Sequence, residues 1–178
     1  MSTSSAVTSQ IDQLSPPARE FIAGAPHGLL IGNEWTPGEG SEFTTEDPST
    51  GAPICVVAAA TAADVDRAVS AARDAFDNGP WPRMAPAERA ALINKLADLI
   101  EANTGELAEL EALDNGKPAT LAAIIDVPTA VRHLRYYAGW ATKLEGRTIP
   151  VTAPNMLVYT RREPVGVCAQ IIPWNYPL

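Results

Sequence analysis

The spacing of apolar residues changes along the chain, and each change predicts a different kind of element. In the first part, apolar residues gather in two short runs, LLIGNEW (29–35) and ICVVAAA (54–60), separated by the Pro/Gly-rich PSTGAP (48–53). Short runs bounded by turn residues are typical of β-strands. We therefore expect two short strands here, preceded by a short helix over 16–23 with Ser15 as its N-cap.

The period becomes helical after residue 60. Spacings of three and four residues place one set of apolar residues on a single helical face: Val65, Ala68, Val69, Ala72 and Phe76. Thr61 followed by Asp64 predicts a capping box at the start of this helix. The segment NGPWPRM (78–84) predicts its end.

Four more helical stretches are expected before residue 145. The first carries an apolar stripe of Leu92, Ile93, Leu96, Leu99 and Ile100. Asn103 and Glu106 are predicted to cap the next helix, which Gly116 ends. The last two stretches, over 119–125 and 128–144, each follow or contain a proline near their start.

The texture changes again near the end of the chain. RTIPV (147–151) and MLVYTRRE (156–163) flank the turn-like TAPN (152–155), which predicts a two-stranded ribbon. VGVCAQII (165–172) is apolar with little alternation, as expected of a strand buried on both faces of a parallel sheet. Such a strand needs neighbours and long crossovers. The sequence is therefore expected to be the opening part of a larger α/β protein.

Composition and charge narrow the class of protein. The chain has 178 residues, is 46% hydrophobic and carries a net charge of −8, which argues against nucleic-acid binding. No apolar run approaches the roughly 18 residues of a membrane span, and the Ser/Thr-rich residues 1–14, an expected mobile tail, do not resemble a signal peptide. The two cysteines and two histidines lack zinc-ligand spacing. A cytoplasmic protein without membrane or nucleic-acid partners is expected.

The last stretch, EPVGVCAQIIPWNYPL (163–178), resembles the start of the cofactor domain in the aldehyde dehydrogenase superfamily, where a strand runs into Pro-Trp-Asn-Phe/Tyr-Pro. Three further stretches are similar to signatures of the same family, in the same order: LDNGKP (113–118), RYYAGWATKLEGRTIP (135–150) and YTRREPVGV (159–167). The resemblance covers nearly the whole chain. The opening FIAGAPHGLLIGNEW (21–35) looks closest to bacterial phenylacetaldehyde-type members.

The resemblance implies an α/β fold: the N-terminal part of an aldehyde dehydrogenase-like subunit, with helices, short strands, an oligomerisation ribbon and the first strand of a Rossmann-like parallel sheet. The expected domains are a tail and short helix (1–24), the N-terminal part of the cofactor-binding domain (25–145), the ribbon (146–163) and the first core strand of the cofactor domain (164–178). In the family the ribbon extends a neighbouring subunit's sheet, which implies a homo-oligomer, a dimer or a tetramer. The charged residues 161–163 also fit an ordinary solvated edge.

The resemblance also implies an activity and its residues. In the family a cysteine thiolate attacks an aldehyde, hydride leaves to NAD or NADP, and water releases the carboxylic acid. Asn175 would donate a hydrogen bond to the developing oxyanion, which its side-chain NH2 suits. Ile172, Pro173, Trp174 and Asn175 would line the cofactor at the carboxyl end of the strand. From the residues alone, Asn175 also fits a turn and Trp174 a core aromatic.

A monovalent cation is a further implication of the resemblance. Family members often hold one with an Asp side chain and two main-chain oxygens, and the matching positions are Asp114, Thr45 and Glu46. Oxygen ligands suit a hard cation. Asp114 also fits a local role near the end of its helix.

Neither cysteine is expected to be the nucleophile. Cys168 lies in the middle of the predicted core strand, where a cysteine behaves as an inert small hydrophobe, and Cys55 is similar. In the family the catalytic Cys and the general-base Glu lie beyond the region present here. The sequence thus predicts the N-terminal portion of an NAD(P)-dependent aldehyde dehydrogenase, inactive alone. The alternatives are an inactive remnant that binds a partner through the ribbon and a catalytically silent small-molecule binder.

Overall fold

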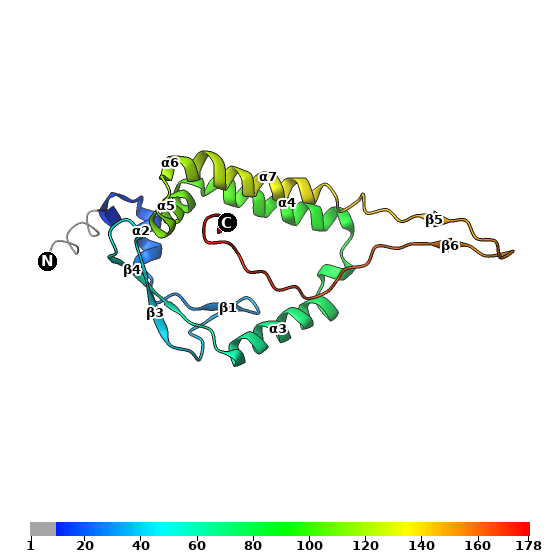
Figure 1. Cartoon of the computed structure of the whole chain (residues 1–178), viewed down its shortest axis with the longest axis horizontal. Helices are drawn as coiled ribbons and strands as arrows, with labels where there is room; N and C mark the ends of the chain where they lie inside the picture. Colours follow the sequence, from blue (N-terminus) through cyan, green and yellow to red (C-terminus); the bar gives the residue numbers. More distant parts are fainter. Residues whose placement is uncertain (1–9) are drawn as a thin grey trace.

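The computed structural model describes residues 10–178. The helices are α2 (Pro16–Ala23), α3 (Ala62–Asp77), α4 (Pro86–Ala102), α5 (Thr104–Asn115), α6 (Ala119–Leu121) and α7 (Val127–Ala138), with a 3-10 turn η1 (Trp81–Arg83) and a π-helical turn η2 (Ala122–Asp126). The strands are β1 (Leu29–Ile31), β2 (Glu34–Thr36), β3 (Glu42–Glu46), β4 (Pro53–Ala58), β5 (Thr148–Ile149) and β6 (Val158–Tyr159). Helices α4 and α7 lie along one another, and the β5–β6 ribbon projects away from the body (Figure 1).

The core lies where α5 meets η2 and the start of α7. Ala108, Ala122 and Val127 are its buried centre, and Ile100, Leu107 and Ala123 pack against it. Small side chains allow the helices to approach closely here. None of the described helices combines the length and the apolar character needed to cross a membrane.

The ends of the predicted helices are partly confirmed. Helix α2 has the predicted bounds, although Ser15 makes no side-chain cap. At α3 the predicted capping box is present, because Thr61 Oγ1 accepts from Asp64 N at 3.2 Å and the Asp64 carboxylate accepts from Thr61 N at 2.8 Å. The cap of α5 by Asn103 and Glu106 is wrong, since the Asn103 amide instead donates to Leu99 O at 2.8 Å.

The two last helical stretches differ from their predicted limits. The chain remains helical through η2 into α7, so Pro128, the second residue of α7, lies inside a continuous helical stretch and removes one helical N–H there. Helix α7 ends at Ala138 rather than at residue 144. Of the predicted mobile tail, residues 10–13 are helical, and residues 1–9 lie outside the described part of the chain.

The strands also differ in detail. The predicted strand over 29–35 is a hairpin, because Gly32 and Asn33 both have positive φ (61° and 68°) and turn β1 back onto β2. Strand β4 confirms the second prediction, and its antiparallel partner β3 was not predicted. The ribbon is confirmed as an antiparallel pair, with Thr148 opposite Tyr159.

The predicted strand over 165–172 does not form. Most of its side chains are exposed, with Val165 at 93% and Ile171 at 100% of their accessible surface, and Val167 is half-buried. A strand buried on both faces needs a hydrogen-bonded neighbour on each side, and no described strand pairs with this segment. The prediction is therefore wrong for this chain as it folds alone. The assignment of residues 164–178 to a Rossmann-like sheet stays a prediction.

Candidate functional site

The candidate site is a turn close to the C-terminus. Tyr176 N donates to Pro173 O at 3.3 Å, so residues 173–176 form a tight turn with Trp174 and Asn175 at its centre. This agrees with the turn role that Asn175 can take. Within the described residues, the Asn175 side chain has no hydrogen-bond partner, and the residue is exposed. Its amide is therefore available to a ligand while its main chain shapes the turn.

The turn rests on Lys117, which follows helix α5. Lys117 Nζ donates to the main-chain oxygen of Asn175 at 2.8 Å and lies 4.2 Å from the centre of the Tyr176 ring. An ammonium at this distance over an aromatic face is a cation–π contact. Two consecutive residues of the turn are thus held by one side chain.

Local structure at the end of α5 explains where Lys117 lies. Gly116 ends the helix with φ +78°, a left-handed conformation that a residue with a Cβ rarely adopts. Asn115 Oδ1 then accepts a hydrogen bond from Lys117 N at 2.9 Å, which closes a turn. The Asn-Gly-Lys sequence therefore turns the chain at α5 and fixes the start of the lysine side chain.

Two buried carboxylates face the Lys117 ammonium. Glu111 from α5 accepts from Nζ at 3.1 Å, and Asp126 from the end of η2 also accepts from it. Burial raises the pKa of Glu111, as does its hydrogen bond with Asp126, despite the nearby lysine. Burial is the largest influence on Asp126 and opposes its ionisation, but the hydrogen bonds with Lys117 and Glu111 and the positive charge of Lys117 together outweigh it, so the pKa of Asp126 is lowered.

The same cluster raises the pKa of Lys117. Burial favours its neutral form, but hydrogen bonds to Asp126 and Glu111 hold the pKa of Lys117 above its ordinary value. Lys117 is therefore a permanent cation at neutral pH. The cluster of Lys117, Glu111 and Asp126 joins helix α5, turn η2 and the C-terminal turn.

The sequence did not predict this cluster. Within LDNGKP (113–118), the sequence predicts a helix end at Gly116 and a cation ligand at Asp114, but no role for Lys117. The burial of Glu111 could have been predicted from the sequence. It lies four residues after Leu107 and three after Ala108, on the apolar face of its helix. An acidic residue on a buried face needs a cationic partner.

The residues predicted to line the cofactor, 172–175, lie on an exposed stretch that leads into the turn and forms most of it. Ile172 is 53% exposed and Trp174 is 77% exposed, so Trp174 is not a core aromatic in this chain. Pro173 supplies the acceptor that closes the turn. These apolar surfaces are free to contact a flat, partly apolar molecule.

The residues predicted to hold a cation lie in two neighbouring segments. Asp114 is exposed near the end of α5, and Thr45 and Glu46 end β3. The turn after β3 packs against the end of α5, because a Cβ added to Gly116 would lie 3.0 Å from Pro48 Cγ. Thr45 Oγ1 donates to Cys55 O at 3.3 Å. Among the described residues, no three His, Cys, Asp or Glu side chains gather to hold a metal ion.

The cysteines have different surroundings. Cys55 is half-buried in β4 beside Thr45 Oγ1, at 3.5 Å. Cys168 is exposed, contrary to the predicted burial, because the strand that would bury it does not form. Its sulfur has one weak contact, to Gly166 O at 3.6 Å, and none of the described basic residues contacts it.

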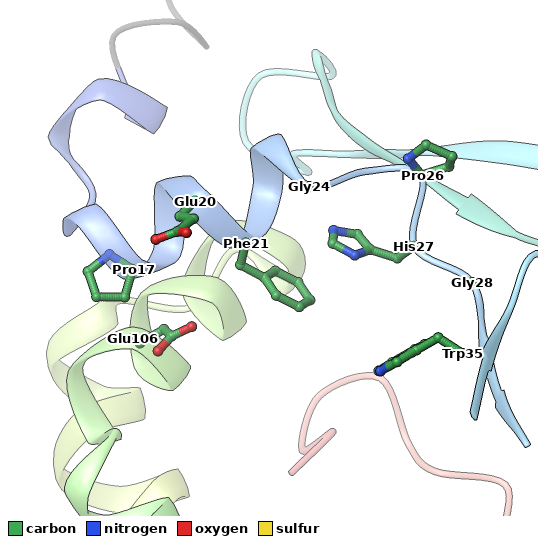
Figure 2. Close-up of a pocket in the computed structure, with 9 residues that line it drawn as sticks. All are labelled: Pro17, Glu20, Phe21, Gly24, Pro26, His27, Gly28, Trp35 and Glu106. Atoms are coloured by element: carbon green, nitrogen blue, oxygen red, sulfur yellow. The ribbon is translucent and has the colours of Figure 1, made fainter. Parts of the chain in front are cut away.

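A separate cavity of about 580 Å³ lies beside helix α2 (Figure 2). The rings of Phe21 and His27 stack at 4.2 Å on one side, and the carboxylates of Glu20 and Glu106 lie on another. Trp35 of β2 stands across the opening. None of the predicted site residues lines this cavity, so it is distinct from the Asn175 turn.

Helices, short strand pairs and a projecting ribbon make up an α/β chain whose structure matches the N-terminal region of solved aldehyde dehydrogenases. The model of the aldehyde dehydrogenase family matches residues 35–178, and the chain belongs to this family. The resemblance found in the sequence is thereby confirmed.

Curated relatives and solved structures agree with this assignment. The chain is 53% identical over 152 residues to the mitochondrial aldehyde dehydrogenase of Equus caballus, covering 84% of this chain and 30% of that protein. It is 53% identical over 154 residues to the aldehyde dehydrogenase of Alternaria alternata, covering 86% and 31%. The chain therefore spans about a third of the length of these relatives.

Two solved structures have the same fold. The NAD+ complex of aldehyde dehydrogenase from Bacillus cereus matches with a TM-score of 0.88 and 49% identity, covering 92% of this chain and 33% of that one. The indole-3-acetaldehyde dehydrogenase of P. syringae, in a complex with NAD+, matches with a TM-score of 0.82 and 38% identity, covering 90% and 33%. The predicted α/β class, with helices and short strands, is confirmed by these likenesses.

Proposed function

We propose that this chain is the N-terminal portion of an NAD-dependent aldehyde dehydrogenase that oxidises an aldehyde to a carboxylic acid. The observation that carries the proposal is the turn over 173–176, which leaves the Asn175 amide unengaged at the surface. The relatives reported above are aldehyde dehydrogenases, and both solved neighbours described there are complexes with NAD+.

In this proposal the Asn175 NH2 donates a hydrogen bond to the aldehyde oxygen as negative charge develops on it. A neutral amide is a suitable donor, because it carries no proton that the oxyanion can remove at neutral pH. Its position is set before the reaction, so little reorganisation is needed as charge forms. Ile172, Pro173 and Trp174 would contact NAD or NADP, which supplies the hydride acceptor when bound.

The nucleophilic cysteine and the general base are proposed to lie outside these residues. In the described part of the chain, the hydrogen-bond contacts of the Cys168 and Cys55 sulfurs are with Gly166 O and Thr45 Oγ1, neither of which is a basic group. A thiohemiacetal would therefore form on a cysteine elsewhere in the enzyme. We further propose that Asp114, Thr45 and Glu46 hold a monovalent cation, and that residues 146–163 extend a neighbouring subunit's sheet in a homo-oligomer.

The test has two parts. The reading frame that follows Leu178 is sequenced, and the full-length protein it encodes is assayed for NADH or NADPH formation with a panel of aldehydes. Phenylacetaldehyde belongs in the panel because residues 21–35 resemble phenylacetaldehyde-type members. We expect turnover with the full-length protein and none with the 178-residue chain. Turnover by the chain alone that is lost in Cys168→Ser or Cys55→Ser would contradict the proposal.

A further inference from the structure

We propose that Lys117 is a positioning residue for Asn175: its ammonium, seated on Glu111 and Asp126, holds the turn that presents the Asn175 amide. The inference rests on the proposed function, because it assigns a role in the same reaction. Lys117 does not touch the reacting atoms. It acts through the main chain of the residue that does.

The contacts determine where the turn lies. Lys117 Nζ reaches Asn175 O at 2.8 Å and the Tyr176 ring at 4.2 Å. The oxygen that accepts from Lys117 belongs to Asn175, the proposed oxyanion donor. A shift of Lys117 Nζ therefore moves the Asn175 amide with it. Within the described chain, the segment from 160 to 178 contains neither helix nor strand, and Lys117 contacts two of its consecutive residues, Asn175 and Tyr176.

Two buried carboxylates hold the Lys117 ammonium in place. Glu111 and Asp126 are only 7% and 6% exposed, and both contact Nζ. A buried carboxylate without a cation is unfavourable, so the two acids keep Lys117 charged and in place. The Lys117 ammonium has three N–H donors. Two of them bind Glu111 and Asp126, and the third binds the Asn175 carbonyl.

The π-helical turn places the second acid. A π turn inserts one extra residue and rotates the helix that follows. Asp126, the last residue of η2, and Val127, the first of α7, are consecutive and both buried, at 6% and 0% exposure. The turn therefore directs Asp126 to Lys117 while Val127 enters the core. Residues of α5, η2 and the C-terminal turn thus all contact the Lys117 side chain.

The main test is a double-mutant cycle in the full-length enzyme. Asn175→Ala should lower kcat by roughly 10²–10³. Lys117→Met should lower kcat by about 10–10², since a misplacement of about 1 Å has an effect of this size, with the KM for NAD nearly unchanged. Combining the two should lower kcat no further than Asn175→Ala alone, because Lys117 acts only through Asn175. A purely structural role would multiply the two losses.

Two more variants complete the test. Lys117→Met alone leaves two buried acids unpaired, so it is also made together with Glu111→Gln and Asp126→Asn, which removes the charges as a group. This neutral variant should fold and show the same loss in kcat. Lys95→Met, the same substitution on the exposed surface of α4, should leave kcat unchanged.

The outcomes separate the two proposals. If Asn175→Ala lowers kcat while the neutral variant does not, or if the losses multiply, the role of Lys117 is overturned and the proposed function stands. If Asn175→Ala has no effect on kcat, both are overturned.

Discussion

The main chain and the side chain of Asn175 make different contacts. Its main-chain oxygen accepts from Lys117 Nζ at 2.8 Å, and its side chain has no partner among the described residues. A turn residue whose side chain bonded its own backbone could not also serve a ligand. In this structure the main chain of Asn175 is held in the turn while its side chain stays free to bind a ligand.

We predict that Asn175→Ala in the full-length enzyme lowers kcat by roughly 10²–10³ and leaves the affinity for NAD nearly unchanged. The lost amide acts on charge that exists only in the transition state, whereas cofactor contact involves mainly the apolar residues before it. Steady-state kinetics with varied NAD and aldehyde give both quantities. Asn94→Ala, on the exposed surface of α4, is the matched control. A change confined to KM would show that Asn175 has a structural role.

At this scale the sequence predicted the turn residues and missed their support. From its neighbours alone Asn175 fits a turn, which the structure shows, whereas its role as an oxyanion donor came from the family resemblance and stays a prediction. Lys117 contacts a residue 58 positions away, and nothing in the spacing of the two predicts that contact. The role of Lys117 became visible only when α5 and the C-terminal turn were placed together.

At the scale of elements, helix α3 has a well-defined start. The Asp64 carboxylate accepts from Thr61 N at 2.8 Å, Thr61 Oγ1 at 2.7 Å and Glu39 N at 3.1 Å. The hydrogen bonds from the main chain and side chain of Thr61, then that from Glu39, lower the pKa of Asp64 to about 2, against burial and with help from Arg67. One carboxylate thus joins the helix to the loop before it.

We predict that acid loosens the start of α3. The folded pKa lies below the ordinary value of 3.8, so the stabilisation is complete above about pH 3.8 and is lost as the pH falls through about 2. Hydrogen-exchange protection of the first-turn amides should fall over this range. Asp64→Asn should remove that step and lower protection at neutral pH. Asp66→Asn, exposed on the same helix, should keep it; an identical pH profile in Asp64→Asn would contradict the assignment.

Helix α4 begins with an incomplete cap. The Glu88 carboxylate accepts from Ala85 N at 2.9 Å, but Ala85 has no side-chain oxygen for the free N–H groups of the first turn. We predict that Ala85→Ser in the full-length enzyme raises the free energy of unfolding by about 0.5–2 kcal/mol, without affecting activity. Reversible chemical denaturation measures it.

Ala87→Ser is the control for that change. It introduces the same hydroxyl inside the first turn, where serine is a poorer helix former than alanine, so stability should stay equal or fall. An unchanged or lower midpoint in Ala85→Ser would mean that the first-turn N–H groups already have partners.

Helices were predicted better than strands for a physical reason. The capping box of α3 and the Gly116 end of α5 depend on residues within four positions, so the sequence contains the whole cause. A strand depends on a partner that can lie anywhere in the chain, as β3 does for β4. Residues 165–172 have the right composition and no neighbour, so they remain extended and unpaired.

At the scale of the whole molecule, more large apolar side chains are exposed than buried among the described residues. Leu92, Leu96 and Leu99 lie on one face of α4 and are 44%, 48% and 53% exposed. Val65 and Val69 on α3 are 52% and 50% exposed. The amphipathic pattern that predicted these helices was correct, but the described chain provides no surface to cover those faces. Relatives are about three times as long, and their remaining residues are candidates to cover them.

We predict that the isolated 178-residue chain associates and lacks a cooperative thermal transition. Contiguous exposed apolar surface is rare on soluble monomers, and the lowest free energy is reached when such faces bury one another. Size-exclusion chromatography with light scattering should show broad species larger than a monomer, with strong binding of an apolar dye. Leu96→Lys with Leu99→Lys should reduce both, because two charges interrupt the α4 face, whereas Lys95→Met should not. A monodisperse monomer with a sharp transition would show that these faces are tolerated in water and that the chain folds as an independent unit.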